Sequence, residues 1–200
     1  YGHDDRVCAY TSLMAALEVT DPVHTTVTVL ADKEETGSEG NTGLQSSFLR
    51  YFISDLAEAA GYTGREVLSR SVCLSVDVNA AWDPTFSAPY ERGNSAYLNY
   101  GVCLTKYTGA RGKSDTNDAS AELMARMRSL MDNAGVQWQT GELGKVDGGG
   151  GGTVAKYVAD LDVDTVDIGV PVLSMHAPFE VVSKTDVYMT YLAFRAFARD

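Results

Sequence analysis

Segments rich in β-branched residues alternate with helix-forming segments along this chain, and that alternation limits its possible folds. The strand-like segments span residues 24–30, 72–76, 98–107, 136–140 and 166–173. The helical segments span residues 7–17, 44–60, 118–135, 154–161 and 183–198. Parallel strands need a crossover connection, usually a helix, so this order favours a sheet with helices packed on it. We predict an α/β/α sandwich around a mixed, mostly parallel sheet.

The composition suits one domain with a sizeable core, because 44% of the 200 residues are hydrophobic. The net charge of −11 argues against nucleic acids and anionic membrane surfaces as partners, since both attract positively charged proteins. The sequence contains no run of about 18 apolar residues and no signal-peptide pattern. We therefore expect no membrane span.

The cysteines of the chain are Cys8, Cys73 and Cys103, and each lies within an apolar segment. An odd number of cysteines in apolar segments indicates buried free thiols, which are typical of a reducing compartment. We predict three free thiols, no disulfide and a cytoplasmic location.

Acidic and imidazole side chains gather just past the ends of predicted strands and at the start of the first helix. These residues are Asp4, Glu34, Glu35, Asp77 and His176. Ligands of open α/β sheets bind beyond strand ends, so we expect these side chains to meet there. Carboxylates and imidazole bind divalent ions, and a neighbouring carboxylate can exchange protons with a bound water. The pattern predicts a pair of divalent ions, most often zinc.

Each of these residues also has a simpler interpretation. Glu34 and Glu35 could form a solvated acidic turn, and Asp4 could only cap its helix. Asp77 could be a turn-forming residue at the end of a strand. A lone histidine such as His176 is more often structural than catalytic.

Five consecutive glycines at residues 148–152 precede a helical segment. Backbone N–H groups of such a loop can cradle a phosphate. The lysine and hydroxyl residues of a phosphate loop and the spaced glycines of a dinucleotide site are missing, however. Close backbone approach to an extended substrate or to a metal site is the favoured interpretation.

Three motifs closely resemble those of the aspartyl aminopeptidase family, in its prokaryotic branch. They are Gly-His-Asp-Asp-Arg-Val-Cys at residues 2–8, Ala-Asp-Lys-Glu-Glu at 31–35 with Gly37, Ser38 and Gly43, and Leu-Ser-Met-His-Ala-Pro at 173–178. The resemblance runs through nearly the whole chain and includes the glycine loop at 147–153. It implies a zinc-peptidase-like fold.

The resemblance also implies a role for each candidate residue. Asp4 would bridge two metal ions. Glu35 and His176 would bind one ion, and Asp77 would bind the other. Glu34 would be the general base and acid, passing a proton from the attacking water to the leaving amine. The implied activity is hydrolysis of the N-terminal residue of peptides, with two zinc ions as cofactors and cobalt or manganese as alternatives.

Members of the family also carry an upstream His-x-Asp motif and an inserted β-rich domain that drives assembly into a dodecamer. Neither feature occurs in this sequence. Residues 1–200 are therefore expected to be the C-terminal portion of a catalytic domain whose N-terminal part is missing. The resemblance implies self-association of the complete protein and little activity of these residues alone.

Two other functions remain compatible with the same residues. A related binuclear-zinc hydrolase, such as a deacylase or a carboxypeptidase, would use nearly the same ligands. A non-catalytic, acidic metal-binding or interaction domain would leave these carboxylates solvated.

Overall fold

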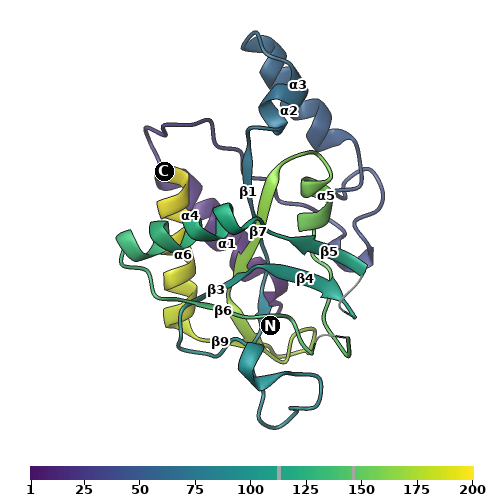
Figure 1. Ribbon diagram of the computed structural model, residues 1–200, viewed down its shortest axis with the longest axis vertical. Coiled ribbons are helices and arrows are strands. Elements are labelled where there is room, and N and C mark those ends of the chain that lie inside the picture. The colour runs from purple at the N-terminus through teal and green to yellow at the C-terminus, as the bar shows by residue number, and fades with distance from the viewer. Residues whose placement is uncertain (112–113, 146) are drawn as a thin grey trace.

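The computed structural model describes residues 1–111, 114–145 and 147–200 (Figure 1). Its helices are α1 (His3–Glu18), α2 (Phe48–Ala59), α3 (Gly64–Leu68), α4 (Ala121–Asn133), α5 (Ala155–Ala159) and α6 (Lys184–Arg199), with 3₁₀ helices η1 (Glu34–Thr36) and η2 (Arg92–Asn94). Its strands are β1 (Val72–Val76), β2 (Asn79–Ala80), β3 (Val102–Thr105), β4 (Tyr107–Ala110), β5 (Ser114–Asp118), β6 (Trp138–Thr140), β7 (Asp164–Gly169), β8 (Pro171–Leu173) and β9 (Val181–Val182). Every predicted helical segment contains a helix.

The main sheet has the strand order β1-β7-β3-β6. β1 runs parallel to β7 and β3 runs parallel to β6, whereas β3 and β7 are antiparallel. The sheet is therefore mixed and mostly parallel, as predicted.

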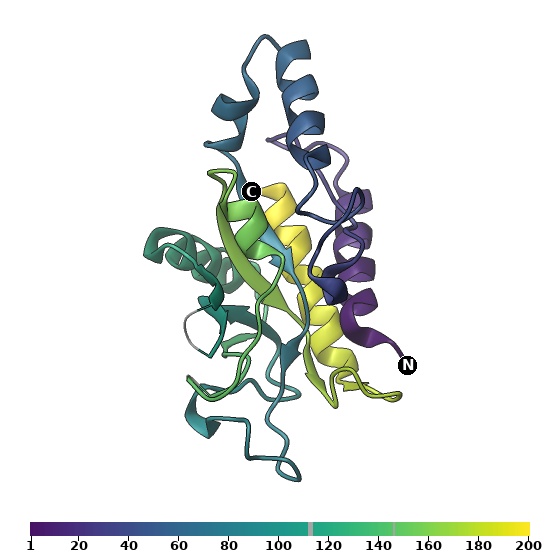
Figure 2. The ribbon, with the colours of Figure 1, turned by 90° about the vertical axis from the view of Figure 1, so that its right-hand side faces the viewer.

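Successive residues of β1 face opposite sides of the main sheet, as the pleat of a strand requires. Leu74 packs on the core that α4 and α6 share with the sheet, where Met127 and Met131 are fully buried. Cys73 packs on the other side, against Val158 of α5 and Leu68 of α3. Helices therefore cover both faces, and α1 lies beside α6 (Figure 2).

Two strands of the main sheet continue into a smaller sheet of order β2-β8-β9. β1 leads through Asp77 and Val78 into β2, and β7 leads through Val170 into β8. β2 and β8 are again parallel. Asp77 thus lies at the junction of the two sheets, while His176 lies in the loop after β8.

Two sequence expectations about strands are wrong, those for residues 24–30 and 109–117. Residues 24–30 are exposed and pair with no strand within the described ranges, because β-branched residues form a strand only against a partner. The apolar run Val72–Val76 forms β1 and packs on both faces, but as an edge strand it buries only Ser75 fully. Residues 109–117 resemble a loop, whereas β4 and β5 pair there as an antiparallel hairpin. Residues 112–113 lie outside the described part.

The three cysteines are free, as predicted. Cys8 and Cys103 are buried and Cys73 is partly buried. Among the described residues, no helix combines the length and the hydrophobicity needed to cross a membrane.

Candidate metal centre

Three side chains from distant parts of the chain meet at the surface. The Nε2 atom of His176 lies 2.9 Å from Oδ2 of Asp4 and 3.3 Å from Oε1 of Glu35. One ligand atom from each residue lies within 4.8 Å of the others. Two carboxylates and one imidazole in this arrangement match the ligand types and the ligand number of a catalytic zinc site. The residues present therefore fit a divalent ion.

Asp4 reaches this cluster from the first turn of α1. The backbone of Asp4 and Asp5 has non-helical angles, and the peptide bond between these residues is cis. Gly2, just before the helix, adopts a positive φ of 63°. Regular helix begins only after Asp5, so the two carboxylates are placed by an irregular turn.

Glu34 and Glu35 lie in the short helix η1, which is flanked by left-handed residues. Lys33 has φ 63° and Gly37 has φ 88°. The N–H of Gly37 donates to the carbonyl of Glu34, and the carbonyl of Gly37 accepts a 2.6 Å hydrogen bond from Gln45. These two hydrogen bonds of Gly37 stabilise the turn that carries Glu34 and Glu35. The carboxylates follow an irregular segment, not the strand that the sequence predicts.

His176 belongs to the turn after β8, and it also has an unusual backbone. Ser174 and His176 adopt positive φ angles of 58° and 66°. Such angles are costly for residues with a Cβ and are typical of functional sites. The imidazole is 61% exposed, so an ion held there would remain open to substrate.

Asp77 lies beside this cluster but is not one of its three members. Its Oδ1 atom accepts a 2.7 Å hydrogen bond from the N–H of Val78. Burial raises the pKa of Asp77 well above its usual range, and the charges of Asp5, Asp4 and Glu34 add to this effect. The structure therefore brings Asp77 within electrostatic reach of the proposed site.

Negative charge is concentrated on several carboxylates at this place. Burial and the charge of Glu35 raise the pKa of Asp4 to about 6, although His176 lowers it. Burial raises the pKa of Asp5 to about 8, and the charge of Asp4 contributes. The Oδ1 atom of Asp5 is buried without a hydrogen-bond partner among the described residues. Bound cations would relieve this repulsion.

Glu34 differs from its neighbour in its environment. Burial raises the pKa of Glu34, and the charges of Glu35 and Asp4 raise it further. A carboxylate with a raised pKa is suited to accept and return a proton near neutral pH. Glu34 is therefore the candidate for a general base.

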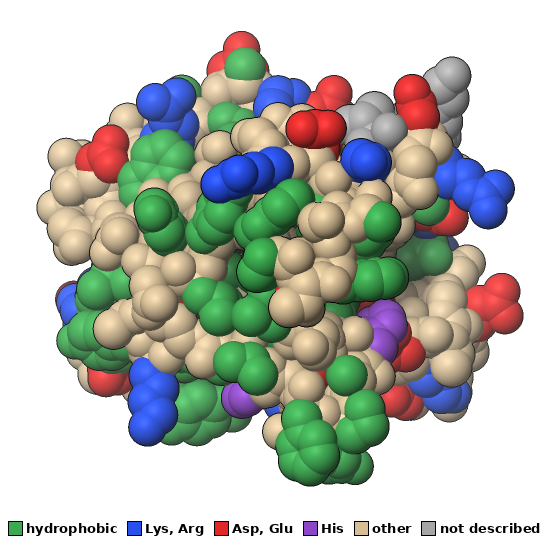
Figure 3. All heavy atoms as spheres, turned by 90° about the horizontal axis from the view of Figure 1, so that it is seen from below, with side chains coloured by type: hydrophobic (Ala, Val, Ile, Leu, Met, Phe, Trp, Pro, Cys, Tyr) green, Lys and Arg blue, Asp and Glu red, His purple; other side chains and the backbone are tan. Residues whose placement is uncertain are grey.

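Seen from below, the molecular surface shows a histidine side chain next to acidic side chains (Figure 3). The exposure of Glu35 and His176 agrees with a site that opens to solvent. Carboxylates and imidazole on an open face can bind an ion and still leave room for a substrate.

The chain matches a known protein family over nearly its whole length. The model of the aminopeptidase I zinc metalloprotease family, M18, matches residues 1–198. This chain belongs to the M18 family.

The similarity extends to curated relatives and to solved structures. The probable M18 family aminopeptidase 1 of Clostridium acetobutylicum is 47% identical over 98% of this chain, and that of Thermotoga maritima is 45% identical over 98%. The crystal structure of aminopeptidase I from C. acetobutylicum superposes with a TM-score of 0.92 over the full chain. The resemblance to aminopeptidases and the predicted fold class are thereby confirmed.

The M18 chain spans less than half the length of these relatives. It covers 43% and 44% of the two curated proteins, and 44% of the solved C. acetobutylicum chain. The aspartyl aminopeptidase 1 of Schizosaccharomyces pombe is 29% identical over 83% of this chain and 34% of its own length. A Saccharomyces cerevisiae structure described as a mApe1 dodecamer is 24% identical, with a TM-score of 0.77, and shares the fold.

The glycine loop of this M18 chain packs on the hairpin β4–β5. The carbonyls of Gly149 and Gly151 accept hydrogen bonds from the N–H groups of Arg111 and Gly109. A Cβ added to Gly150 would lie 2.3 Å from the carbonyl oxygen of Gly109. These glycines therefore permit close approach to the backbone of the same chain.

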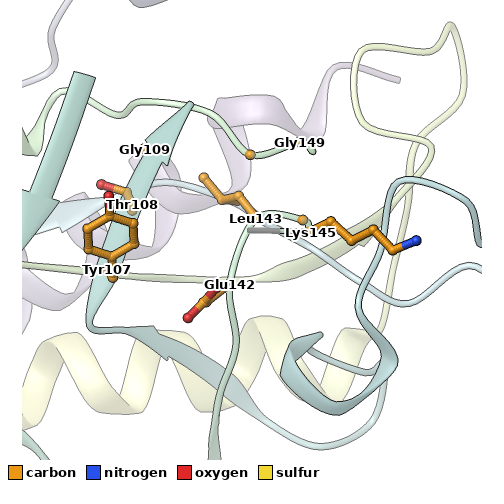
Figure 4. Close-up of a pocket in the computed structure, with 9 residues that line it drawn as sticks. Tyr107, Thr108, Gly109, Glu142, Leu143, Lys145 and Gly149 are labelled. Atoms are coloured by element: carbon orange, nitrogen blue, oxygen red, sulfur yellow. The ribbon is translucent and has the colours of Figure 1, made fainter. Parts of the chain in front are cut away.

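A shallow hollow lies between the glycine loop and the hairpin (Figure 4). Leu143 lies between Thr108 and Gly149, while the side chain of Lys145 extends away from the other lining residues (Figure 4). Among the residues described for this hollow, none is a member of the Asp4–Glu35–His176 cluster.

Proposed function

We propose that this chain forms part of the catalytic domain of a zinc-dependent aminopeptidase that removes the N-terminal residue of peptides. The observation that carries the proposal is the convergence of Asp4, Glu35 and His176 beside Glu34. The family description, which names a zinc metalloprotease, supports zinc as the ion. Cobalt and manganese bind the same ligand types and are alternatives to be tested.

The proposed roles follow the chemistry of each side chain. Glu35 and His176 would hold one ion, Asp77 would hold a second, and Asp4 would be a ligand of both. Bound zinc supplies Lewis-acid chemistry and lowers the pKa of a water. The carboxylate of Glu34 accepts a proton from the attacking water and donates it to the amine that leaves.

The proposal extends to organisation and location. Residues 1–200 represent the C-terminal portion of the catalytic domain, and the β-rich oligomerisation domain of the family is not part of them. The complete protein self-associates as a dodecamer, the assembly described for the S. cerevisiae protein. The three free thiols support a cytoplasmic location.

Substrate panels test the proposed activity. The complete protein, loaded with zinc, should hydrolyse peptides with a free N-terminal amine and should leave the same peptides intact when that amine is acetylated. Chelation should abolish the activity, and added zinc should restore it. Cleavage of the acetylated peptides alone would favour a deacylase, and release of the C-terminal residue would favour a carboxypeptidase. Zinc binding without any cleavage would favour a metal-binding domain.

A further inference from the structure

One buried carboxylate joins the two ends of the chain that carry ligands of the proposed metal site. Glu180 is 7% exposed. Its Oε2 atom accepts hydrogen bonds from the backbone N–H groups of His3, at 2.6 Å, and Asp4, at 3.1 Å. Its Oε1 atom accepts a 2.8 Å hydrogen bond from the N–H of His176. Each carboxylate oxygen therefore serves a different segment.

The segment of His3 and Asp4 and the turn of His176 both gain from a hydrogen-bond acceptor such as the carboxylate of Glu180. The first N–H groups of α1, including those of His3 and Asp4, have no acceptor within the helix. His176 adopts a left-handed φ of 66°, which is unfavourable for a residue with a Cβ. Hydrogen bonds to an ionised carboxylate are about twice as strong as neutral ones. Glu180 thus stabilises two local conformations that no regular element maintains.

We propose that Glu180 is a positioning residue that sets the separation of the Asp4 and His176 side chains and thereby the affinity of the site for zinc. This inference rests on the proposed function, because it concerns the same metal site. Both oxygens of Glu180 are engaged by backbone donors, so this residue acts through Asp4 and His176 and not as a ligand.

The structure offers a matched control for a purely structural effect. Asp186, on α6, is 1% exposed and also bridges two backbone N–H groups, those of Asn99 at 2.7 Å and Gly101 at 2.9 Å. It belongs to the same C-terminal part of the chain but holds no segment that carries a proposed ligand. Asp186→Asn should therefore lower the stability of the fold without changing the affinity of the metal site.

Zinc titration of the complete protein tests the inference. Glu180→Gln should weaken zinc binding by roughly 10- to 100-fold, the range typical of residues that orient metal ligands. Both Glu180→Gln and Asp186→Asn should lower the melting temperature, and only Glu180→Gln should lower the zinc affinity. Saturating zinc should restore occupancy in Glu180→Gln.

The outcomes separate this inference from the proposed function. Absence of zinc binding in the wild type would refute the proposed function itself. Wild-type binding with an unchanged affinity in Glu180→Gln, or an equal loss in Asp186→Asn, would refute only the positioning role. If Glu180→Gln does not fold, Glu180→Asp gives a second measurement. The shorter carboxylate keeps the charge but cannot reach both segments, so it should also weaken zinc binding, and a wild-type affinity would overturn the inference.

Discussion

Glu34 and Glu35 are adjacent in the chain, but their side chains meet different surroundings. The side chain of Glu35 is 57% exposed and contacts the imidazole of His176. Glu34 is more buried, and its pKa is raised by that burial and by the charges of Glu35 and Asp4. This difference is why the two carboxylates can divide metal binding and proton transfer between them.

Replacing each glutamate in turn should therefore give opposite phenotypes in the complete protein. Glu34→Gln should lower turnover by roughly 10²–10⁴-fold, the usual contribution of a general base, and leave the zinc content intact. Glu35→Gln should instead lower the zinc content. Metal analysis alongside steady-state kinetics checks both expectations. Equal loss of zinc in the two variants, or near-normal turnover of Glu34→Gln, would show that the roles are wrongly assigned.

Asp167 is a buried carboxylate outside the proposed site. It lies on β7, is 4% exposed and accepts a 2.6 Å hydrogen bond from Thr153. Burial raises its pKa, and the hydrogen bonds of Thr153 and Asn117 lower it only in part. The folded chain thus holds the Asp167 proton more tightly than the unfolded chain does.

This difference has a defined effect on stability. Because the folded state binds this proton more tightly, the contribution of Asp167 to the free energy of unfolding falls as the pH rises above about 4, from the usual pKa of an aspartate through the raised one. Asp167→Asn should remove this part of the pH dependence. Urea denaturation at a series of pH values checks it, with the exposed Asp21→Asn as control. A variant whose stability falls as steeply as that of the wild type would contradict the expectation.

The candidate ligands could be predicted from the sequence because their motifs are local. The sequence predicts that these side chains meet, but it places Glu34 and Glu35 after a strand that does not form, and the contacts of Glu180 could not be derived from spacing. Its contacts join residues at opposite ends of the chain. The only hint in the sequence is weak, since Glu180 follows His176 by four residues and could bond to the same turn.

The end of β7 passes very close to the residue that follows β1. A Cβ added to Gly169 would lie 1.8 Å from the carbonyl oxygen of Asp77. Only glycine allows these two strands to leave the main sheet side by side. The position of Asp77 therefore depends on the absence of a side chain at residue 169.

Gly169→Ala should destabilise the fold by about 1–3 kcal/mol, the usual cost of overpacking a filled core. The same variant should weaken binding of the second ion, because the backbone of Asp77 must shift. Gly93→Ala is the control, since a Cβ there meets nothing within 4 Å. Chemical denaturation measures both variants. Equal stability of Gly169→Ala and Gly93→Ala would mean that the two strands move apart without cost.

Helices of this protein are easier to predict than strands, for a physical reason. The apolar face of α4, which includes Met127 and Met131, can be recognised from the helical spacing of the apolar residues within that segment. Pairing of a strand depends on a partner elsewhere, so residues 24–30 look like a strand but have no partner strand within the described ranges. The hairpin β4–β5 escapes prediction for the converse reason, because the polar residues of β5 resemble a loop until they pair with β4.

The described residues offer unequal ligand sets for the two proposed ions. Asp4, Glu35 and His176 form a cluster that could hold one ion, whereas the proposed roles leave only Asp77 and a shared Asp4 for the second. Zinc sites in proteins normally have at least three protein ligands. We expect a polypeptide of residues 1–200 to bind one zinc ion tightly and to have little aminopeptidase activity, and we expect the complete protein to bind two.

Calorimetric zinc titration of both forms provides the measurement. His176→Ala in the 200-residue polypeptide should remove its tight site. Two tight sites in that polypeptide would instead show that a local group, such as His3, supplies the additional ligand.

The pairing of α1 with α6 and the bonds of Glu180 bring the beginning of this sequence to its end. A ribosome releases Asp4 and Glu35 long before it has made His176. Until His176 has been made, the emerging chain therefore lacks the imidazole of the Asp4–Glu35–His176 cluster, and the cluster forms only once that segment has folded back onto the first helix. The proposed zinc site is therefore complete only in a chain that has been translated at least as far as Glu180.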